Sequence, residues 1–235
     1  MINGINSREM ILEILLEIEE GEHSHVAIRN ALSKYQFLPK QDRAFITRVC
    51  EGTLEYRIQI DYIINSFSKV TVDKMKPAIR EILRSAVYQL KYMDSVPDSA
   101  VCNEAVKLAQ RKGFYNLKPF VNGVLRTIAR EMDQVRFPQK EDDLLKYLSV
   151  KYSMPEVLVT RWLEAYGEET TEKILADFLM EHPLTIRCRT YLNSKEEVIK
   201  SLESQGVHVA PAPYLPYAYS ISEFNHILAL DAFIK

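Results

Sequence analysis

The sequence is poor in residues that build cross-linked or metal-bound folds. Its 235 residues include three cysteines, Cys50, Cys102 and Cys188, which are far apart and form no Cys-x-x-Cys pair. This predicts neither a disulfide framework nor a thiolate zinc site, and we expect three reduced cysteines that lie mostly in the core. The five histidines have no cysteine or carboxylate at ligand spacing, so we expect no metal.

Long apolar runs are also missing. No stretch approaches the roughly 18 residues that a membrane-spanning helix needs. The N-terminal segment carries Glu9, Glu13 and Glu17, where a signal peptide needs an uninterrupted apolar core. We therefore expect a cytoplasmic protein without membrane contact.

Net charge is close to zero, but the charges are unevenly distributed. The formal net charge is −2, whereas residues 69–130 hold 12 Lys and Arg against 5 Asp and Glu. Counterion release from a polyanion depends on such a local excess rather than on the global charge. Residues 69–130, the basic block, are therefore the first candidate for binding nucleic acid.

Helical periodicity dominates the first half of the chain. Apolar residues recur every three or four positions from residue 7 to about 131, and Gly21 and Gly113 mark helix ends. The pattern predicts six or seven helices with short connections, one of them over Ser24–Lys34. The fold class is thus mainly α: an all-helical bundle over residues 1–134, followed by a small α+β domain.

Helical periodicity breaks off at Met132–Lys140, which predicts a domain boundary. We expect a helical linker segment over 135–182, in which Ser153-Met-Pro-Glu156 has the form of a capping box. In the small α+β domain, 183–235, the pattern predicts a strand over 184–190, a helix capped by Ser194 and a short strand over 207–209. The proline- and tyrosine-rich stretch 211–219 predicts a loop or edge strand.

Several motifs in the helical part resemble a known family. Asp42-Arg43, Gly52-Thr-Leu-Glu-Tyr-Arg57, Ile82-Leu-Arg-Ser-Ala-Val-Tyr-Gln-Leu90, Asn103-Glu-Ala-Val106 and Phe120-Val-Asn-Gly-Val-Leu-Arg126 are similar, in this order, to signatures of the NusB-like domain that opens bacterial ribosomal RNA cytosine-C5 methyltransferases. Pro155 to Gly167 and Pro183-Leu-Thr-Ile-Arg187 resemble the adaptor of the small-subunit methyltransferase B family. Arg189 and Val157 depart from the adaptor's usual asparagine and tryptophan.

The resemblance implies a front end that binds ribosomal RNA and orients it for methylation by its own C-terminal methyltransferase domain. That domain would supply S-adenosylmethionine chemistry in the full-length enzyme. The family's catalytic cysteines follow proline and threonine, whereas Cys50 and Cys102 follow valine and Cys188 follows Arg187. We therefore expect no catalytic residue in this chain, and the apolar final residues 228–235 indicate a polypeptide that continues.

A cofactor site is not expected either. S-adenosylmethionine sits against a glycine-rich turn between strand and helix, because only glycine permits the close backbone approach. The seven glycines are scattered, and the nearest pair, Gly113 and Gly123, lies ten residues apart. We therefore expect no cofactor in this chain.

Charged residues of the basic block fall on three helical stripes. Spacings of three and four place them on common helix faces that we expect to be accessible, with Tyr88 available to stack on an unpaired base. Solvated faces with surface ion pairs are the alternative, and Arg84 and Arg126 could instead be partly buried against Asn103 or Glu104. The predicted RNA-binding residues are Lys76, Arg80, Arg84, Tyr88, Lys107, Arg111, Lys112, Lys118, Asn122 and Arg126.

Two other functions compete with this hypothesis. A free-standing antitermination factor of the NusB type would bind RNA together with a ribosomal protein, but the adaptor after residue 140 counts against it. The basic block could also dock mainly on the chain's own catalytic domain. Asp42 and Asp61 have no accompanying nucleophile, so helix capping or ion pairing is the expected role of both.

Overall fold

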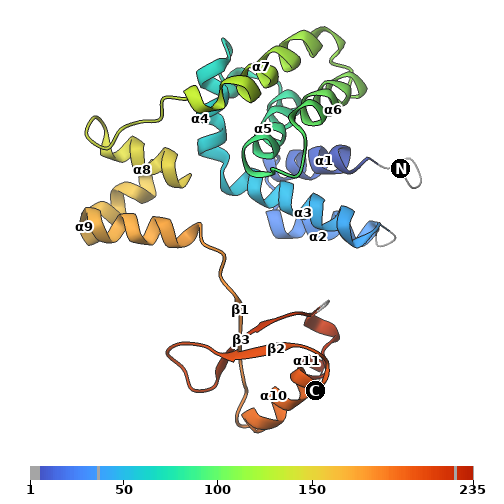
Figure 1. Cartoon of the computed structure of the whole chain (residues 1–235), viewed down its shortest axis with the longest axis vertical. Coiled ribbons are helices and arrows are strands. Elements are labelled where there is room, and N and C mark those ends of the chain that lie inside the picture. Colours follow the sequence, from blue (N-terminus) through green and yellow to red (C-terminus); the bar gives the residue numbers. More distant parts are fainter. Residues whose placement is uncertain (1–5, 36–37, 225–226, 235) are drawn as a thin grey trace. The chain divides into compact units, whose positions relative to one another are not determined.

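The computed structural model describes residues 6–35, 38–224 and 227–234 (Figure 1). The chain divides into two compact units, residues 1–178 and 179–235. The first is built of helices and the second carries the sheet, so the predicted class, an all-helical bundle followed by a small α+β domain, is confirmed.

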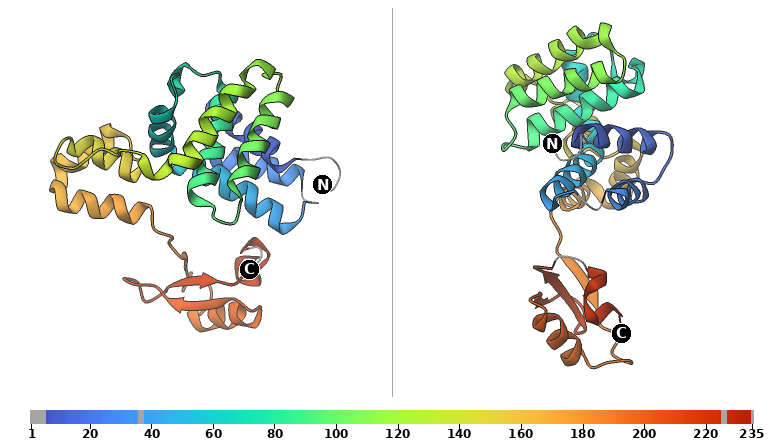
Figure 2. Two further views of the ribbon diagram at one scale, coloured as in Figure 1. Left: turned by 45° about the horizontal axis from the view of Figure 1, so that its top comes forward. Right: turned by 90° about the vertical axis from the view of Figure 1, so that its right-hand side faces the viewer.

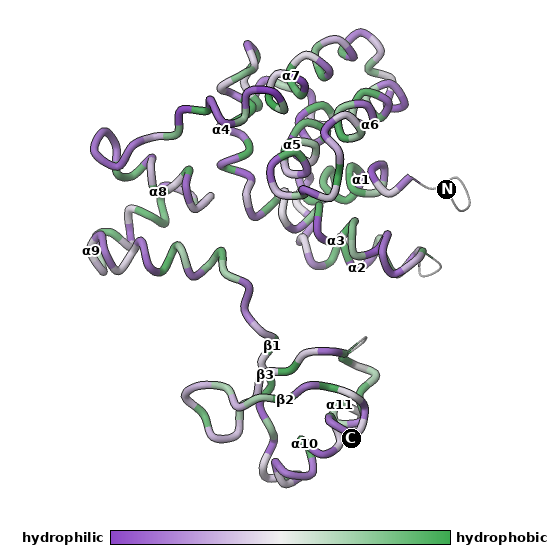
Figure 3. The backbone as a smooth tube through the Cα atoms, viewed as in Figure 1, coloured by the Kyte–Doolittle hydropathy of each residue, from purple (hydrophilic) through white to green (hydrophobic). Residues whose placement is uncertain are grey.

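The first unit begins with a bundle of helices that pack around α5. Figure 3 shows hydrophobic and hydrophilic residues alternating along these helices, as amphipathic helices require. The predicted helix over 24–34 is confirmed. The helices are α1 (Ser7–Glu19), α2 (Ser24–Lys34), α3 (Lys40–Glu55), α4 (Arg57–Phe67), α5 (Pro77–Tyr92), α6 (Asp98–Arg111) and α7 (Lys118–Glu131).

Helix α5 is the centre of this bundle. It contacts α1, α3, α4, α6 and α7, and every residue from Glu81 to Gln89 is buried. Pro77 occupies its first turn, where the missing N–H costs no intrahelical hydrogen bond. A helix buried on all sides must bury its polar residues too, so those of α5 need internal partners.

Helices α3 and α5 approach each other closely at Gly52 of α3. Tyr88 of α5 lies against this glycine, and a Cβ atom added to Gly52 would overlap the hydroxyl end of the tyrosine ring. The ring is also stacked near Tyr56 and Tyr92, with centroid distances of 6.4 and 5.3 Å. The absence of a side chain at Gly52 therefore makes room for a buried tyrosine.

Two further helices, α8 (Leu144–Tyr152) and α9 (Glu156–Phe178), complete the first unit. They lie in the predicted linker segment, yet α8 packs on α4, where the side-chain amide of Gln59 donates to the carbonyl oxygens of Val150 and Lys151, both at 3.1 Å. Residues 135–178 thus belong to the helical unit.

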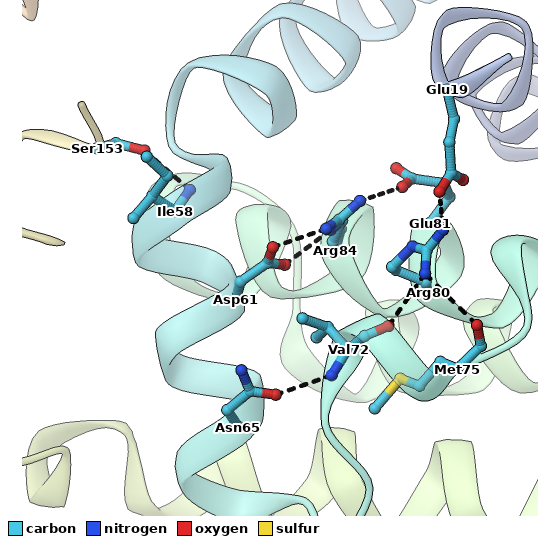
Figure 4. A network of polar contacts seen from close by, with 10 residues as sticks. All are labelled: Glu19, Ile58, Asp61, Asn65, Val72, Met75, Arg80, Glu81, Arg84 and Ser153. Carbon is cyan, nitrogen blue, oxygen red and sulfur yellow. Dashed lines mark hydrogen bonds and ion pairs between the residues drawn. The ribbon is translucent and has the colours of Figure 1, made fainter. Parts of the chain in front are cut away.

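The expected capping box at Ser153 is wrong. Ser153 is in the left-handed conformation, with φ of 52°, and ends α8 instead of starting α9. Its hydroxyl oxygen accepts a hydrogen bond at 3.0 Å from the backbone N–H of Ile58, 95 positions earlier (Figure 4). A partner that far along the chain is invisible to local sequence pattern.

A cluster of ion pairs and hydrogen bonds connects α8 to α9. Glu172 of α9 accepts hydrogen bonds from Lys151 at 2.9 Å, Lys140 at 3.1 Å and the Tyr152 hydroxyl at 3.1 Å. The bond from Lys151 is the main cause that lowers the pKa of the Glu172 carboxyl to about 2. Gly167, with φ of 73°, kinks α9.

The second unit is a three-stranded antiparallel sheet with helices on one face. Its elements are β1 (Leu184–Arg187), α10 (Lys195–Ser204), β2 (His208–Pro211), β3 (Ala218–Ser222) and α11 (Asp231–Ile234), and the strand order is β1-β3-β2. The predicted capping box of Ser194 with Glu197 is confirmed. Pro211 ends an edge strand, as expected, but Ala218 and Tyr219 lie in the central strand β3, so the expectation of a loop or edge strand is wrong for these two residues.

Leu202, Val207, Ile221 and Leu230 form the core of this unit. Figure 2 shows the sheet and its helices from two further sides. Over both units, the described residues include no helix long and apolar enough to span a membrane. All three cysteines are free and buried, as expected.

The contact at Gly52 makes a testable prediction about packing. We expect Gly52→Ala to lower the free energy of unfolding by about 1–3 kcal/mol, because the new methyl group overpacks the bundle against Tyr88. Chemical denaturation measures the change. The matched control is Gly123→Ala in α7, where nothing lies within 4 Å of the added Cβ, and where alanine should stabilise the helix by about 0.5–1 kcal/mol. Equal effects of the two substitutions would contradict this account.

Candidate nucleic-acid interface

The predicted basic stripe on α5 is largely an internal ion-pair network (Figure 4). Arg84 donates to both carboxylate oxygens of Asp61 on α4, at 2.7 and 2.6 Å, and to Glu81 at 2.5 Å. The Arg84 side chain is 9% exposed and that of Glu81 is 4% exposed. Burial raises the pKa of the Glu81 carboxyl, against the opposing effect of Arg84.

Arg80 and Tyr88 also point inward. Arg80 pairs with Glu19 of α1 and donates to the carbonyl oxygen of Val72 at 3.2 Å. Tyr88 is 6% exposed behind Gly52. The expectation that this stripe stays accessible is therefore wrong for Arg80, Arg84 and Tyr88, because α5 lies at the centre of the bundle. Lys76, at the N-cap of α5, is exposed.

The structure shows which role Arg84 and Asp61 have. Arg84 has the structural role considered for it, but its partners are Asp61 and Glu81 instead of Asn103 or Glu104. Asp61 is an ion-pair residue, as expected. Arg84 therefore joins α4 and α5, and its burial leaves it poorly placed to contact a ligand.

The other two stripes form one surface. Helices α6 and α7 pack side by side and are joined by the short connection 112–117 (Figures 1 and 2). Arg126 Nη2 donates to Asn103 Oδ1 at 3.3 Å across the two helices, so they run antiparallel with these residues opposite each other. We call this surface the α6–α7 face; it comprises Asn103, Lys107, Arg111, Lys118, Asn122 and Arg126.

Arg126 orients both asparagines of the α6–α7 face. Its Nε donates to Asn122 Oδ1 at 2.9 Å, while its Nη2 reaches Asn103. With both amide oxygens used as acceptors, the amide NH₂ groups remain as donors. Together with the cations, they give the face an excess of donors, which suits the oxygen acceptors of a phosphate and ribose backbone.

The cations of this region differ in how firmly they are held. Lys107 pairs with Glu104 at 2.8 Å, and this hydrogen bond lowers the pKa of the Glu104 carboxyl. Lys112 lies behind the face, where it contacts Glu13 at 3.0 Å and Glu9 at 3.2 Å. Arg111 and Arg126 are exposed, so they are the most available guanidinium groups.

Sequence reasoning missed one residue beside this face. Tyr115, on the connection between α6 and α7, is 61% exposed, whereas Tyr88 is buried. It lies in a short 3-10 turn directly before Lys118. The available signal was the position of this tyrosine just after the helix end marked by Gly113, because connections between helices lie on the surface.

The described residues contain no glycine-rich turn between a strand and a helix. The connection that leads from β1 into α10, residues 188–194, contains no glycine that would allow a close backbone approach. Gly113 ends α6 with φ of 87°, and Gly123 lies on an exposed part of α7. No group of three or more potential metal ligands occurs in the parts of the chain that the structure describes.

Comparisons with known proteins agree with this architecture. The model of the NusB family matches residues 5–130, and that of the Methyltr_RsmF/B-like ferredoxin-like domain matches residues 154–227. The chain belongs to the NusB family. The expected combination of a NusB-like domain with the adaptor of this methyltransferase group is confirmed. The two models leave residues 1–4, 131–153 and 228–235 unmatched.

Similar proteins fall into two groups. The chain is 32% identical over 202 residues to a probable ribosomal RNA small subunit methyltransferase B of Bacillus subtilis. The matched region covers 86% of this chain and 44% of that relative. It is 33% identical over 130 residues to the transcription antitermination protein NusB of Dictyoglomus thermophilum, covering 55% of this chain and 85% of the relative. The chain thus spans less than half the length of the methyltransferase relative.

A solved structure shares the fold. The crystal structure of PH0851 superposes with a TM-score of 0.67 at 22% identity, covering 98% of this chain and 52% of that one. The similarity covers both units, so a helical unit followed by a sheet-bearing unit also occurs in that structure.

The two arginines that were considered together, Arg84 and Arg126, should differ sharply in their effect on stability. We expect Arg84→Ala to cost about 3–5 kcal/mol of unfolding free energy, because Glu81 is left buried without its partner. Arg126→Ala, at an exposed position, should cost less than about 1 kcal/mol. Urea denaturation compares the two, and similar losses would show that Arg84 is not an internal ion-pair residue.

Proposed function

We propose that this chain is the RNA-binding front part of a ribosomal RNA cytosine-C5 methyltransferase. In this role the NusB domain holds ribosomal RNA through the α6–α7 face, and the sheet-bearing unit links it to a catalytic domain that binds S-adenosylmethionine. The chain's own residues bind and orient RNA, and the chemistry of methyl transfer lies outside the residues described.

The single observation that carries the proposal is the α6–α7 face itself. It brings four cations and two oriented amide groups from α6 and α7 onto one surface. Exposed guanidinium groups bind phosphate through two donors, and an exposed aromatic beside them can stack on an unpaired base. Tyr115 takes the stacking role first expected of Tyr88.

A free-standing antitermination factor is the second candidate. The antitermination relative from Dictyoglomus thermophilum covers 55% of this chain, whereas the methyltransferase relative covers 86%. The ferredoxin-like domain over 154–227 lies outside the NusB match at 5–130, so it favours the methyltransferase proposal.

Charge reversal on the α6–α7 face tests RNA binding. We expect Lys107→Glu, Arg111→Glu and Arg126→Glu together to weaken binding of a labelled single-stranded ribosomal RNA fragment by about tenfold or more at 0.15 M salt, because phosphate contacts are replaced by repulsion. Fluorescence anisotropy over a range of salt concentrations measures both the affinity and the salt dependence, which should become shallower.

The control variant reverses Arg161 of α9, an exposed arginine outside the face. Arg161→Glu should leave the affinity close to that of the unaltered chain. Binding that is unchanged in the triple variant, or reduced equally by Arg161→Glu, contradicts the assignment of RNA to the α6–α7 face.

A further inference from the structure

The connection from β2 to β3, residues 212–217, projects from the sheet as a hairpin loop (Figure 1). The N–H of Ala212 donates to the carbonyl oxygen of Ala218 at 3.0 Å and closes the base of the loop. Within it, Pro213 and Pro216 have their φ angles fixed by their rings. The loop is therefore stiff, and a side chain on it loses little freedom when a ligand binds.

Tyr214 lies between these prolines in a strained conformation. Its φ is 76°, in the left-handed region that bulky side chains rarely adopt. Its side chain is also 97% exposed, so the ring gains little from packing that could offset the strain. Strained residues of this kind are typical of binding sites, where the surrounding structure holds them in place.

The connection that follows β1 lies at the same end of the sheet. β1 ends where Arg187 pairs with Ala218, the first residue of β3. The N–H of Cys188, the next residue, donates to the carbonyl oxygen of Tyr217 in the hairpin loop at 2.9 Å. Tyr191, on the connection after β1, is 78% exposed. One end of the sheet thus carries two exposed tyrosines from two different loops.

The cations at this end of the sheet are available to a ligand. Arg187 and Arg189 are exposed, and within the described parts of the chain neither of them forms an ion pair. The carboxylates that follow along the chain are already engaged. Glu196 lies 3.9 Å from the neighbouring lysine, and Glu197 accepts hydrogen bonds in the cap of α10. Both guanidinium groups therefore keep their donors for an anion.

We propose that this end of the sheet binds an unpaired stretch of RNA. We call the surface the hairpin end; it comprises Arg187, Arg189, Tyr191 and Tyr214. The tyrosine rings would stack on bases, and the guanidinium groups would pair with phosphates. Stacking accepts any base, so this contact tolerates different sequences.

The combination of aromatic and cationic groups decides the class of ligand. An acidic peptide would satisfy the two arginines, but its carboxylates offer no planar group to the two tyrosines. The inference rests on the proposed function, because the same RNA is expected on the α6–α7 face. It adds to that function a second RNA contact, on the sheet-bearing unit.

Removal of the two rings tests the proposal in the 235-residue chain. We expect Tyr191→Ala and Tyr214→Ala together to weaken binding of a labelled oligouridine of about 12 nucleotides at least about fivefold, because each variant loses a stacking surface. Fluorescence anisotropy measures the affinity. Tyr191→Phe and Tyr214→Phe keep both rings and should bind as the unaltered chain does.

Tyr214→Gly separates binding from folding. Glycine adopts a φ of 76° without strain, so this variant should unfold at the same temperature as the unaltered chain or a higher one, yet bind the oligouridine as weakly as Tyr214→Ala. Crosslinking with 5-iodouridine in the oligonucleotide should attach RNA to peptides that contain Tyr191 or Tyr214. The matched control is Tyr166→Ala on α9, which removes an exposed tyrosine outside the hairpin end and should leave the affinity unchanged.

Unchanged affinity in the double alanine variant, or an equal loss in Tyr166→Ala, would overturn the proposal. So would a labelled oligoglutamate peptide that binds the chain and loses its affinity in the double variant, since the hairpin end would then serve an acidic partner. The α6–α7 face is intact in all of these variants. Binding that falls on charge reversal of the α6–α7 face but not on loss of the tyrosines would therefore sustain the proposed function and reject this inference alone.

Discussion

Burial of Arg84 is the constraint on which the helical unit depends. A guanidinium that is 9% exposed in its side chain requires carboxylate partners, since an unpaired buried charge is costly. Asp61 supplies one partner from α4 and Glu81 another from the same helix. Replacing such a pair by apolar residues is often tolerated, whereas removing one member is not, so its main effect is to specify how α4 and α5 meet.

The basic block therefore contains two kinds of cation: those that pair with carboxylates inside the bundle and those that remain on the surface. Arg80 and Arg84 neutralise acidic residues of α1, α4 and α5, and Lys112 is held by Glu9 and Glu13. Accessible positive charge remains on Lys69, Lys74 and Lys76 before α5 and on the α6–α7 face. The RNA proposal rests on this smaller surface, in which Arg126 orients two asparagine amides and Arg111 is exposed.

The second unit differs from the helical unit because it contains a small sheet, whose edge strands leave backbone groups unpaired on one side. β2, which ends at Pro211, and β1 are the two edge strands of the sheet. A short sheet with one face covered by α10 and α11 buries little apolar surface.

Spacing within a few residues was enough to predict the helices over 7–131, the helix cap at Ser194 and the motifs that resemble the NusB-like domain. Strand β3 escaped prediction, since its five residues follow a proline-rich stretch. The role of each basic stripe was decided only by tertiary structure. Helical periodicity shows that Arg84 and Arg126 each lie on a polar stripe, but the carboxylate of Asp61, 23 positions before Arg84, faces only one of them. Local spacing cannot report which side of a helix meets a distant partner.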